Sequence, residues 1–232
     1  MLDYLDLFFL LYSVYTSIYI LFALSFDLYT LFYLNYNNLN NEIVKYLRSL
    51  DVVLINIFIV GPIYILFYTY ILLYGFNLPN EIVYVYDFNA YFNIFYELIN
   101  VIITLLSAEF FFYFSHRLFH SNKYLYKKVH KLHHKYSIST YGMHAQYCST
   151  YESIMNLITL SLGTMLVKHH IITIIIQSSI MIAINVIGHT TNEFKLFGKL
   201  IYSTKQHNDH HLLQNVNYGL MSICDKYFNT YK

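Results

Sequence analysis

Histidines at helical spacing carry the most specific chemistry in this sequence. All twelve lie after residue 115, and eight of them form three short clusters. The first cluster reads HxxxH and the other two read HxxHH: His116 and His120; His130, His133 and His134; His207, His210 and His211. On a helix, residues three or four positions apart share one face, so each cluster can direct two or three imidazoles into one volume. His134 and His211 directly follow His133 and His210, so each pair points in neighbouring directions and could serve two adjacent metals. A ninth histidine, His189, stands alone at the end of the last apolar run.

These nine imidazoles are too many for one metal ion and suit two ions that keep open positions. Imidazole-rich sites suit iron, zinc, copper or nickel, and the residue types alone leave that choice open. A structural zinc site is closed, four-coordinate and usually contains thiolates. Cys148 and Cys224 form no CxxC pair and are predicted to be free, buried thiols. An open, all-nitrogen site therefore fits redox iron better than structural zinc.

The remaining histidines near these segments are predicted to be packing or interface residues. His144 follows the second cluster and has the alternative role of orienting a ligand. His169 and His170 are expected to form a polar turn at the membrane interface. For the three clusters, the alternative is a solvated basic patch, but ionisable groups at membrane depth are costly and usually functional.

The composition indicates a membrane protein. Apolar residues make up 57% of the 232 residues and charged residues 12%, about half the usual charged share. The net charge of +1 does not suggest nucleic-acid binding. The first six residues lack a basic segment, so the first apolar run is predicted to be a permanent span rather than a cleaved signal.

The apolar runs predict an all-α integral membrane protein with about three transmembrane helices and a helical hairpin. Each long run is near the ~20 residues that a spanning helix needs. The long runs are Leu7–Leu24 (continuing weakly to Leu34), Val52–Gly75 and Leu98–Phe114. The runs Ile154–Val167 and Ile171–Ile187 are predicted to form the hairpin, and the second could cross the membrane alone. We expect one domain over 1–232, with membrane anchor helices in 1–115 and the catalytic region in 116–232.

The basic residues predict the orientation of these spans. No Lys or Arg precedes Lys45 or lies between Arg48 and Arg117. The positive-inside tendency therefore places a predicted loop, Asn35–Asp51, in the cytosol and the loop Asn77–Ala90 on the other side. The histidine clusters then form a helical cap on the cytosolic side. Five lysines lie beside them: Lys123, Lys127, Lys128, Lys131 and Lys135.

The order of the clusters resembles the fatty acid hydroxylase/sterol desaturase superfamily of membrane di-iron oxygenases, over about residues 105–232. The ending Asn217-Tyr218-Gly219…Asp225-Lys226 is also similar to that of the superfamily. Gln146-Tyr147…Ser149-Thr150-Tyr151-Glu152 is similar to the cholesterol 25-hydroxylase branch, and Gly142-Met143 to the C4-methylsterol oxidases. The sequence departs from the common pattern at Gln206, Asn208, Asn229 and the loop after His189.

The resemblance implies a lipid hydroxylase that uses O2, with two iron ions held by the nine histidines. It implies no other catalytic residue and no organic cofactor site in this chain. Electrons would come from NAD(P)H through a reductase and a cytochrome b5-type donor. The substrate would be a lipid, with a sterol favoured, and the location in a eukaryote would be the endoplasmic reticulum membrane.

Three acidic residues are candidates for supporting roles. Glu109 is expected to reach the membrane interface, with orientation of a ligand as the alternative. Glu152 and Asp225 are equally expected to be structural or to orient ligands. Arg117 and the five lysines are predicted to be solvated, with docking of an acidic electron donor as the alternative. The aromatic run Phe110–Phe114 is predicted to face lipid or to pack, with a substrate wall as the alternative.

The sequence is also compatible with other functions. Within the superfamily they are fatty acid or sphingolipid hydroxylation and sterol desaturation. A metal-binding membrane protein or transporter is an alternative from another class, although transporters usually place their ligands near mid-bilayer. A membrane metalloprotease would need HExxH, which the sequence lacks.

Overall fold

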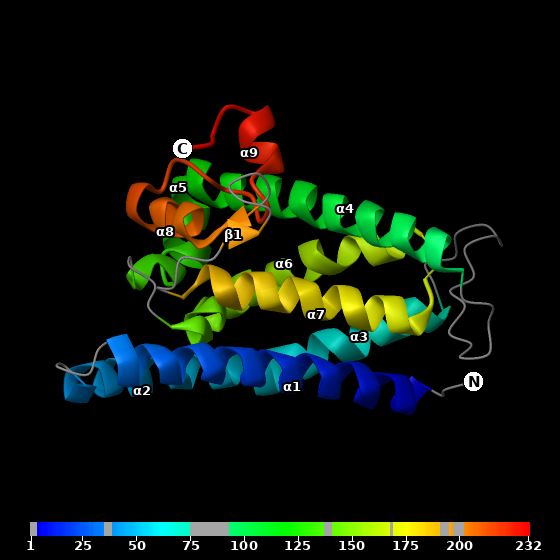
Figure 1. Cartoon of the computed structure of the whole chain (residues 1–232), viewed down its shortest axis with the longest axis horizontal. Coiled ribbons are helices and arrows are strands. Elements are labelled where there is room, and N and C mark those ends of the chain that lie inside the picture. The colour runs from blue at the N-terminus through cyan, green and yellow to red at the C-terminus, as the bar shows by residue number, and fades with distance from the viewer. Residues whose placement is uncertain are drawn as a thin grey trace.

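Long, nearly parallel helices form the protein (Figure 1). The computed structural model describes residues 4–34, 39–74, 93–136, 141–167, 169–190, 195–196 and 202–232. The helices are α1 (Tyr4–Tyr29), α2 (Leu39–Ile55), α3 (Gly61–Tyr74), α4 (Ile94–Ser121), α5 (Lys123–Leu125), α6 (Thr150–Ser161), α7 (Ile171–Gly188), α8 (Thr204–Leu213) and α9 (Ile223–Tyr227). One short antiparallel pair joins β1 (Lys195–Leu196) to β2 (Tyr202–Ser203). The prediction of an all-α membrane protein is confirmed.

Four helical segments in the described part of the chain are long and apolar enough to cross a membrane. They are Tyr4–Phe32, Leu39–Tyr74, Ile94–Ser121 and Ile171–Gly188. Three of them contain the long runs predicted from the sequence, and the fourth is the second arm of the predicted hairpin. The first arm, α6, has only 12 residues. The predicted loop Asn77–Ala90 lies outside the described residues.

The predicted loop Asn35–Asp51 is wrong from Leu39 onward, because α2 begins there and continues through a π-helical turn, Asn56–Val60, into α3. The charged residues of this segment suggested a loop. However, Glu42, Lys45, Arg48 and Asp51 lie three positions apart, and residues at this spacing share one helix face. Tyr46, Ser49 and Val53 on α2 are buried instead.

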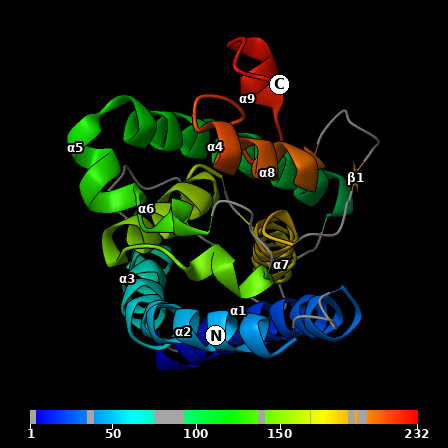
Figure 2. The same ribbon diagram turned by 90° about the vertical axis from the view of Figure 1, so that its left-hand side faces the viewer.

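The helices pack in layers, seen from the end in Figure 2. Helices α1, α2 and α3 form one layer, α6 and α7 lie in the middle, and α4 with α8 and α9 forms the other. The ends of α1, α4 and α7 and the start of α2 lie at the same end of the molecule. That shared end carries the histidine clusters.

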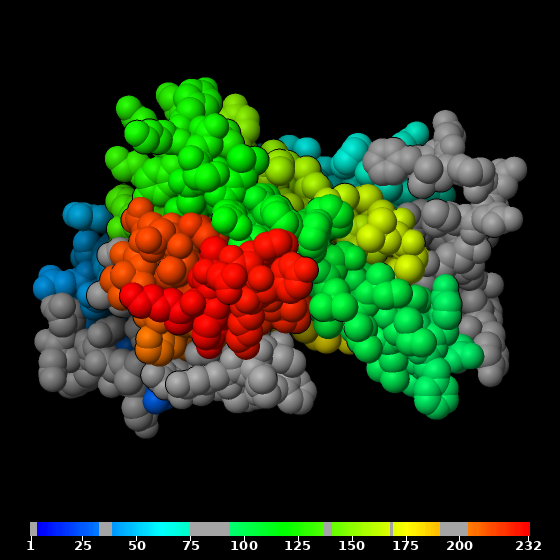
Figure 3. Space-filling model, turned by 90° about the horizontal axis from the view of Figure 1, so that it is seen from above, coloured from blue at the N-terminus to red at the C-terminus, as the bar shows by residue number. Residues whose placement is uncertain are grey.

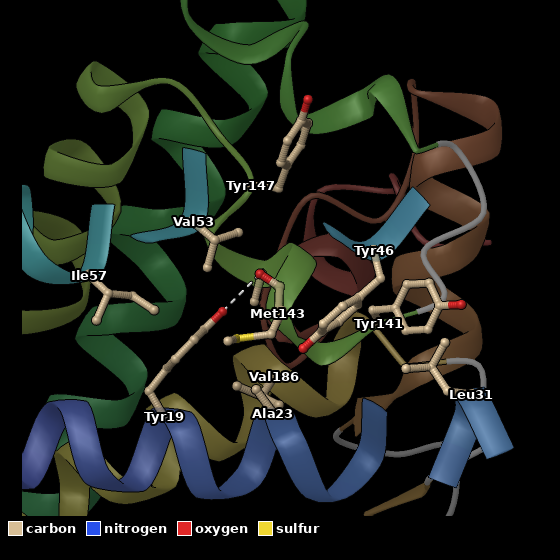
Figure 4. Close-up of a cluster of buried hydrophobic side chains, with 11 residues drawn as sticks. Tyr19, Ala23, Leu31, Tyr46, Val53, Ile57, Tyr141, Met143, Tyr147 and Val186 are labelled. Carbon is tan, nitrogen blue, oxygen red and sulfur yellow. Dashed lines mark hydrogen bonds between the residues drawn. The ribbon is translucent and has the colours of Figure 1, made fainter. Parts of the chain in front are cut away.

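A buried cluster fixes the segment 141–149, which leads from the second histidine cluster to α6 (Figure 4). The Tyr19 hydroxyl donates to the carbonyl of Met143 (2.9 Å). The Asp27 carboxylate accepts from the backbone N–H groups of Gly142 and Met143. In the π-helical turn, Asn56 Nδ2 donates to the carbonyls of Gln146 and Cys148, both at 2.9 Å. These polar groups in membrane helices therefore hold a segment that has only a short 3-10 turn, Gly142–Gln146, and could not face lipid alone.

Gly163 allows α4 and the turn after α6 to approach closely. A Cβ at this position would lie 2.8 Å from both the Cα and the carbonyl oxygen of Thr104. We expect Gly163→Ala to push the turn away from α4 and to lower the free energy of unfolding by about 1–3 kcal/mol. Thermal unfolding in detergent measures this. Gly61→Ala is the matched control, because its Cβ would meet a tyrosine ring at 3.3 Å and the Asn56 carbonyl oxygen at 3.4 Å, both farther away than the contacts at Gly163. Equal losses in the two variants would contradict the close approach.

Candidate metal centre

Three helices and two short helical turns bring the nine predicted histidines to one end of the bundle. The last turns of α4 supply His116 and His120, and the end of α7 supplies His189. Helix α8 supplies the third cluster. The second cluster occupies a π-helical turn, Tyr126–His130, and a 3-10 turn, His133–Lys135, rather than one regular helix. In the view from above, α8 and the C-terminal segment, residues 214–232, lie against α4 (Figure 3).

The nine side chains divide into two groups whose ring nitrogens converge. Within each group, one nitrogen of every residue lies within 4.8 Å of the others. The first group contains His116, His120, His130, His134 and His210. The second contains His133, His189, His207 and His211. As expected, the adjacent residues His133 and His134 point into different groups, and so do His210 and His211.

The nitrogen spacings fit donor atoms around a metal ion. In the first group, His134 Nε2 lies 2.9 Å from His130 Nε2, which lies 3.1 Å from His116 Nε2. In the second group, His207 Nε2 lies 3.0 Å from Nε2 of both His189 and His211. With metal–nitrogen bonds of about 2.1 Å, neighbouring donors lie about 3.0 Å apart at right angles and about 3.4 Å apart at tetrahedral angles. Two further pairs, His134 with His120 and His189 with His133, have Nε2 atoms 3.2 Å apart, so the spacings suit donors to a metal ion in either geometry.

The environment keeps the imidazoles neutral, which is the form that binds metals. Burial lowers the pKa of His134 and of His189 to about 4 in each case. Burial and then the neighbouring imidazoles lower the pKa of His210 and His211 well below the usual value. Nε2 of His210 is buried with no hydrogen-bond partner among the described residues. A buried nitrogen without a hydrogen-bond partner lowers the stability of the fold unless a bound ligand or metal pairs with it.

Several imidazoles are held through their other nitrogen, Nδ1. Three of the acceptors are backbone carbonyls: Tyr218 for His116 (2.7 Å), Asn185 for His189 (2.8 Å) and Val216 for His210 (2.8 Å). The fourth acceptor is Glu152 Oε1, 2.7 Å from Nδ1 of His130. An N–H bond on Nδ1 fixes the tautomer and leaves Nε2 free to bind a metal.

Glu152 takes the orienting role that was one of its two predicted alternatives. Burial raises the pKa of its carboxyl, and a cation bound to His130 would favour the ionised form. We expect Glu152→Ala to weaken metal retention at the first group about 10–100-fold. Glu152→Gln keeps an acceptor oxygen and should lose less. Dialysis against a graded series of chelator concentrations measures both, and equal retention in wild type and Glu152→Ala would contradict this role.

Glu109 does not reach the interface, so that expectation is wrong. Its carboxylate is buried and accepts from the backbone N–H groups of Met221 (2.7 Å) and Cys224 (2.9 Å). Asp225, also buried, accepts from the N–H groups of Tyr218 and Gly219, each at 2.7 Å. Glu109 therefore ties the C-terminal segment to α4, and Asp225 holds Tyr218 and Gly219 within that segment. That segment includes the carbonyls that hold His116 and His210.

Two departures from the superfamily pattern have structural explanations. Asn229 has a φ of 56°, and asparagine is one of the few residues besides glycine that adopt this left-handed conformation readily. Gln206 is buried, accepts from the Ser222 hydroxyl (2.6 Å) and donates to the Tyr231 hydroxyl (2.7 Å). It therefore links α8 to the C-terminal segment.

The other three histidines lie outside both groups. His144 is buried, stacks on Tyr136 and lies 3.2 Å from the Ser49 hydroxyl, in line with a packing role. His169 and His170 are both buried at the start of α7, in line with a packing role, and their place at the membrane interface stays a prediction. The His170 side chain accepts from the backbone N–H of Ile172 and caps α7. Both cysteines are free and buried, as predicted.

Two features lie next to the histidine groups: an exposed, positively charged surface and a cavity. Arg117 and the five lysines between 123 and 135 are exposed, as predicted. Arg117 donates to the Tyr113 hydroxyl (2.9 Å). Of the aromatic run, Phe110 and Phe114 are exposed, whereas Phe112 lines a cavity beside both histidine groups. The sequence alone did not single out this phenylalanine.

Comparison with known proteins agrees with this geometry. The family described as fatty acid hydroxylase matches residues 101–230, more than half of the chain. Human fatty acid hydroxylase domain-containing protein 2 is 29% identical over 134 residues, 57% of this chain and 38% of that protein. A Delta(7)-sterol 5(6)-desaturase of Schizosaccharomyces pombe is 25% identical over 151 residues, 64% of this chain and 49% of that protein. The chain thus covers less than half the length of either relative.

No solved structure matches the chain. The family match nevertheless covers every histidine of both groups, the buried acids Glu109 and Asp225, and Glu152. The chain belongs to the fatty acid hydroxylase family.

Proposed function

We propose that the protein is a membrane oxygenase with two iron ions, which hydroxylates an unactivated C–H bond of a lipid, with a sterol as the favoured substrate. The observation that carries this proposal is the division of nine histidines, seven of them buried and two half-buried, into two converging groups. When bound, two iron ions would supply the activation of O2 that no amino-acid side chain can perform. Both groups consist of histidine nitrogens without a thiolate, which supports iron over structural zinc.

The chain's own residues hold and position the reactants. The nine histidines are the proposed ligands, and the acceptors at Nδ1 fix the orientation of four of them. A cavity of about 580 Å³ lies beside both groups and is lined by Phe112, Ile184 and Leu220 as well as by histidines. Its apolar wall would exclude water from the reacting carbon.

The proposed orientation puts the histidine groups at the cytosolic face. It is supported by Lys45 and Arg48 on α2, because the Lys45 ammonium lies 5.8 Å from the ring centroid of Tyr136, next to the exposed Lys135 of the second cluster. The exposed lysines beside the second cluster would suit an acidic, cytochrome b5-type electron donor supplied by an NAD(P)H reductase. In a eukaryote, we propose the endoplasmic reticulum membrane as the location.

A sterol is favoured over a fatty acyl chain by the similarity of the segment from Gln146 to Glu152 to the sterol-hydroxylating branch, and a sterol desaturase is among the relatives. The test is expression in a sterol-containing host under isotopically labelled O2, followed by analysis of sterols, fatty acids and sphingolipids. We expect one labelled oxygen in a new hydroxysterol. Unchanged lipids with an iron-loaded protein would contradict the proposal and would favour a metal-binding role without oxygenase activity.

A further inference from the structure

A second cavity lies deeper in the bundle, next to the cavity at the histidines. It is lined by residues of α1, α3, α6 and α7. Asn185 of α7 lines both cavities, and its carbonyl accepts from His189. The deep cavity therefore adjoins the metal centre.

The lining of this deep cavity is neutral. Among the described residues that line it, none is Asp, Glu, Lys or Arg, and most are Leu, Ile, Val, Met or Tyr. A carboxylate or phosphate inside would have no cation to pair with, and burying an unpaired charge is very costly. The cavity thus suits an uncharged lipid.

Hydroxyl groups gather where α3 meets the end of α6. Tyr64 is hydrogen-bonded to Ser161, and Tyr68 to Thr164 (2.6 Å), and all four residues line the cavity. The Ser161 hydroxyl donates its single hydrogen to the carbonyl of Ile158 (3.1 Å). Tyr64 is therefore the donor to Ser161, which leaves lone pairs on the Tyr64 oxygen to accept from a ligand. A ligand hydroxyl can donate such a hydrogen bond, whereas a carbonyl or a hydrocarbon cannot.

The distance between this polar end and the metal centre can be measured along α6. Glu152, which contacts His130, and Ser161 both lie on this helix. Nine residues at about 1.5 Å each separate them by about 14 Å. That is close to half of the ~30 Å hydrocarbon thickness of a bilayer, the length of a lipid that fills one leaflet.

We infer that the deep cavity binds a neutral, elongated lipid by its single hydroxyl group at Tyr64 and Ser161, and directs the opposite end of that lipid to the histidine groups. This inference rests on the proposed function. Among sterols, it selects oxidation of the side chain, remote from the ring hydroxyl, over oxidation at ring carbons next to that hydroxyl. Tyr64 and Ser161 are then positioning residues that determine specificity.

Equilibrium binding tests the inference without turnover. The full chain is placed in lipid nanodiscs, and cholesterol and cholestane, which differ by the hydroxyl group, compete with radiolabelled cholesterol. We expect wild type to bind cholesterol at least about 10-fold more tightly than cholestane, because a site that hydrogen-bonds a ligand hydroxyl rejects the analogue without it. Tyr64→Phe and Tyr64→Phe/Ser161→Ala should bring that ratio close to one by weakening cholesterol binding alone. Tyr70→Phe on the exposed face of α3 is the matched control and should keep the wild-type ratio.

These outcomes separate the inference from the proposed function. Hydroxyls that only join helices, as polar groups often do in membranes, would leave the ratio unchanged in Tyr64→Phe, and that result would overturn the inference. Absence of saturable cholesterol binding would also overturn it. A protein that oxidises lipids but shows no hydroxyl preference would refute the inference alone. A protein with the preference but without iron-dependent oxidation would refute only the proposed function. Oxidation of a sterol at a carbon next to the ring hydroxyl would contradict the orientation.

Discussion

Replacing His210 or His133 with alanine is expected to reduce turnover by at least about 100-fold, since loss of even a group that orients a metal ligand costs about 10–100-fold. His210 belongs to the first histidine group and His133 to the second. Each substitution should therefore lower the iron content from two ions per chain toward one. Turnover is measured by product formation, and iron by elemental analysis of the purified protein.

His144→Gln is the matched control for these substitutions. His144 is a buried histidine on the segment that follows the second cluster, but it lies outside both groups. It should keep both iron ions and most activity. Full activity in both His133→Ala and His210→Ala, with normal membrane insertion, would show that the proposed ligand set is wrong.

Glu109→Gln is expected to disrupt the metal centre from a distance. The carboxylate accepts from two backbone N–H groups of the C-terminal segment, and the glutamine side chain would turn an NH2 group toward one of them. A buried donor left without an acceptor costs about 1–3 kcal/mol. We expect a loss of about 2–3 kcal/mol in the free energy of unfolding, together with reduced iron at the first group. The carbonyls of Val216 and Tyr218 that hold His210 and His116 lie in the same segment.

Asp51→Asn makes the same change of charge on an exposed part of α2 and serves as the control for Glu109→Gln. It should leave both stability and iron content near wild type. Unfolding is followed by thermal denaturation in detergent, and iron is measured on the same samples. If the Glu109→Gln protein were less stable but bound iron normally, the contacts of Glu109 would matter for folding alone. That result would contradict the proposed dependence of the first histidine group on Glu109.

The sequence predicted the parts of the site that depend on residue type and helical spacing. All nine histidines lie in the two groups, and the split of adjacent pairs such as His133 and His134 between the groups was expected from their consecutive positions. The apolar runs predicted the spanning helices for the same reason, since length and hydropathy are local properties. The division of the chain into anchor and catalytic region stays a prediction.

Features that depend on tertiary contact could not be predicted. The carbonyl of Tyr218, which holds His116, lies 102 residues away in the chain, and a backbone carbonyl carries no residue signature. The charged start of α2 suggested a loop, because its buried face becomes visible only with the neighbouring segment in place. Glu109 suggested an interfacial residue, because its partners Met221 and Cys224 lie more than a hundred residues away in the chain.

Iron stoichiometry of the purified full chain, combined with Mössbauer spectroscopy, tests the central claim most directly. The two histidine groups predict two iron ions per chain in nitrogen-rich environments, and loss of one ion when either group is disrupted. One ion per chain, or zinc bound in preference to iron when both are supplied, would contradict a dinuclear iron centre.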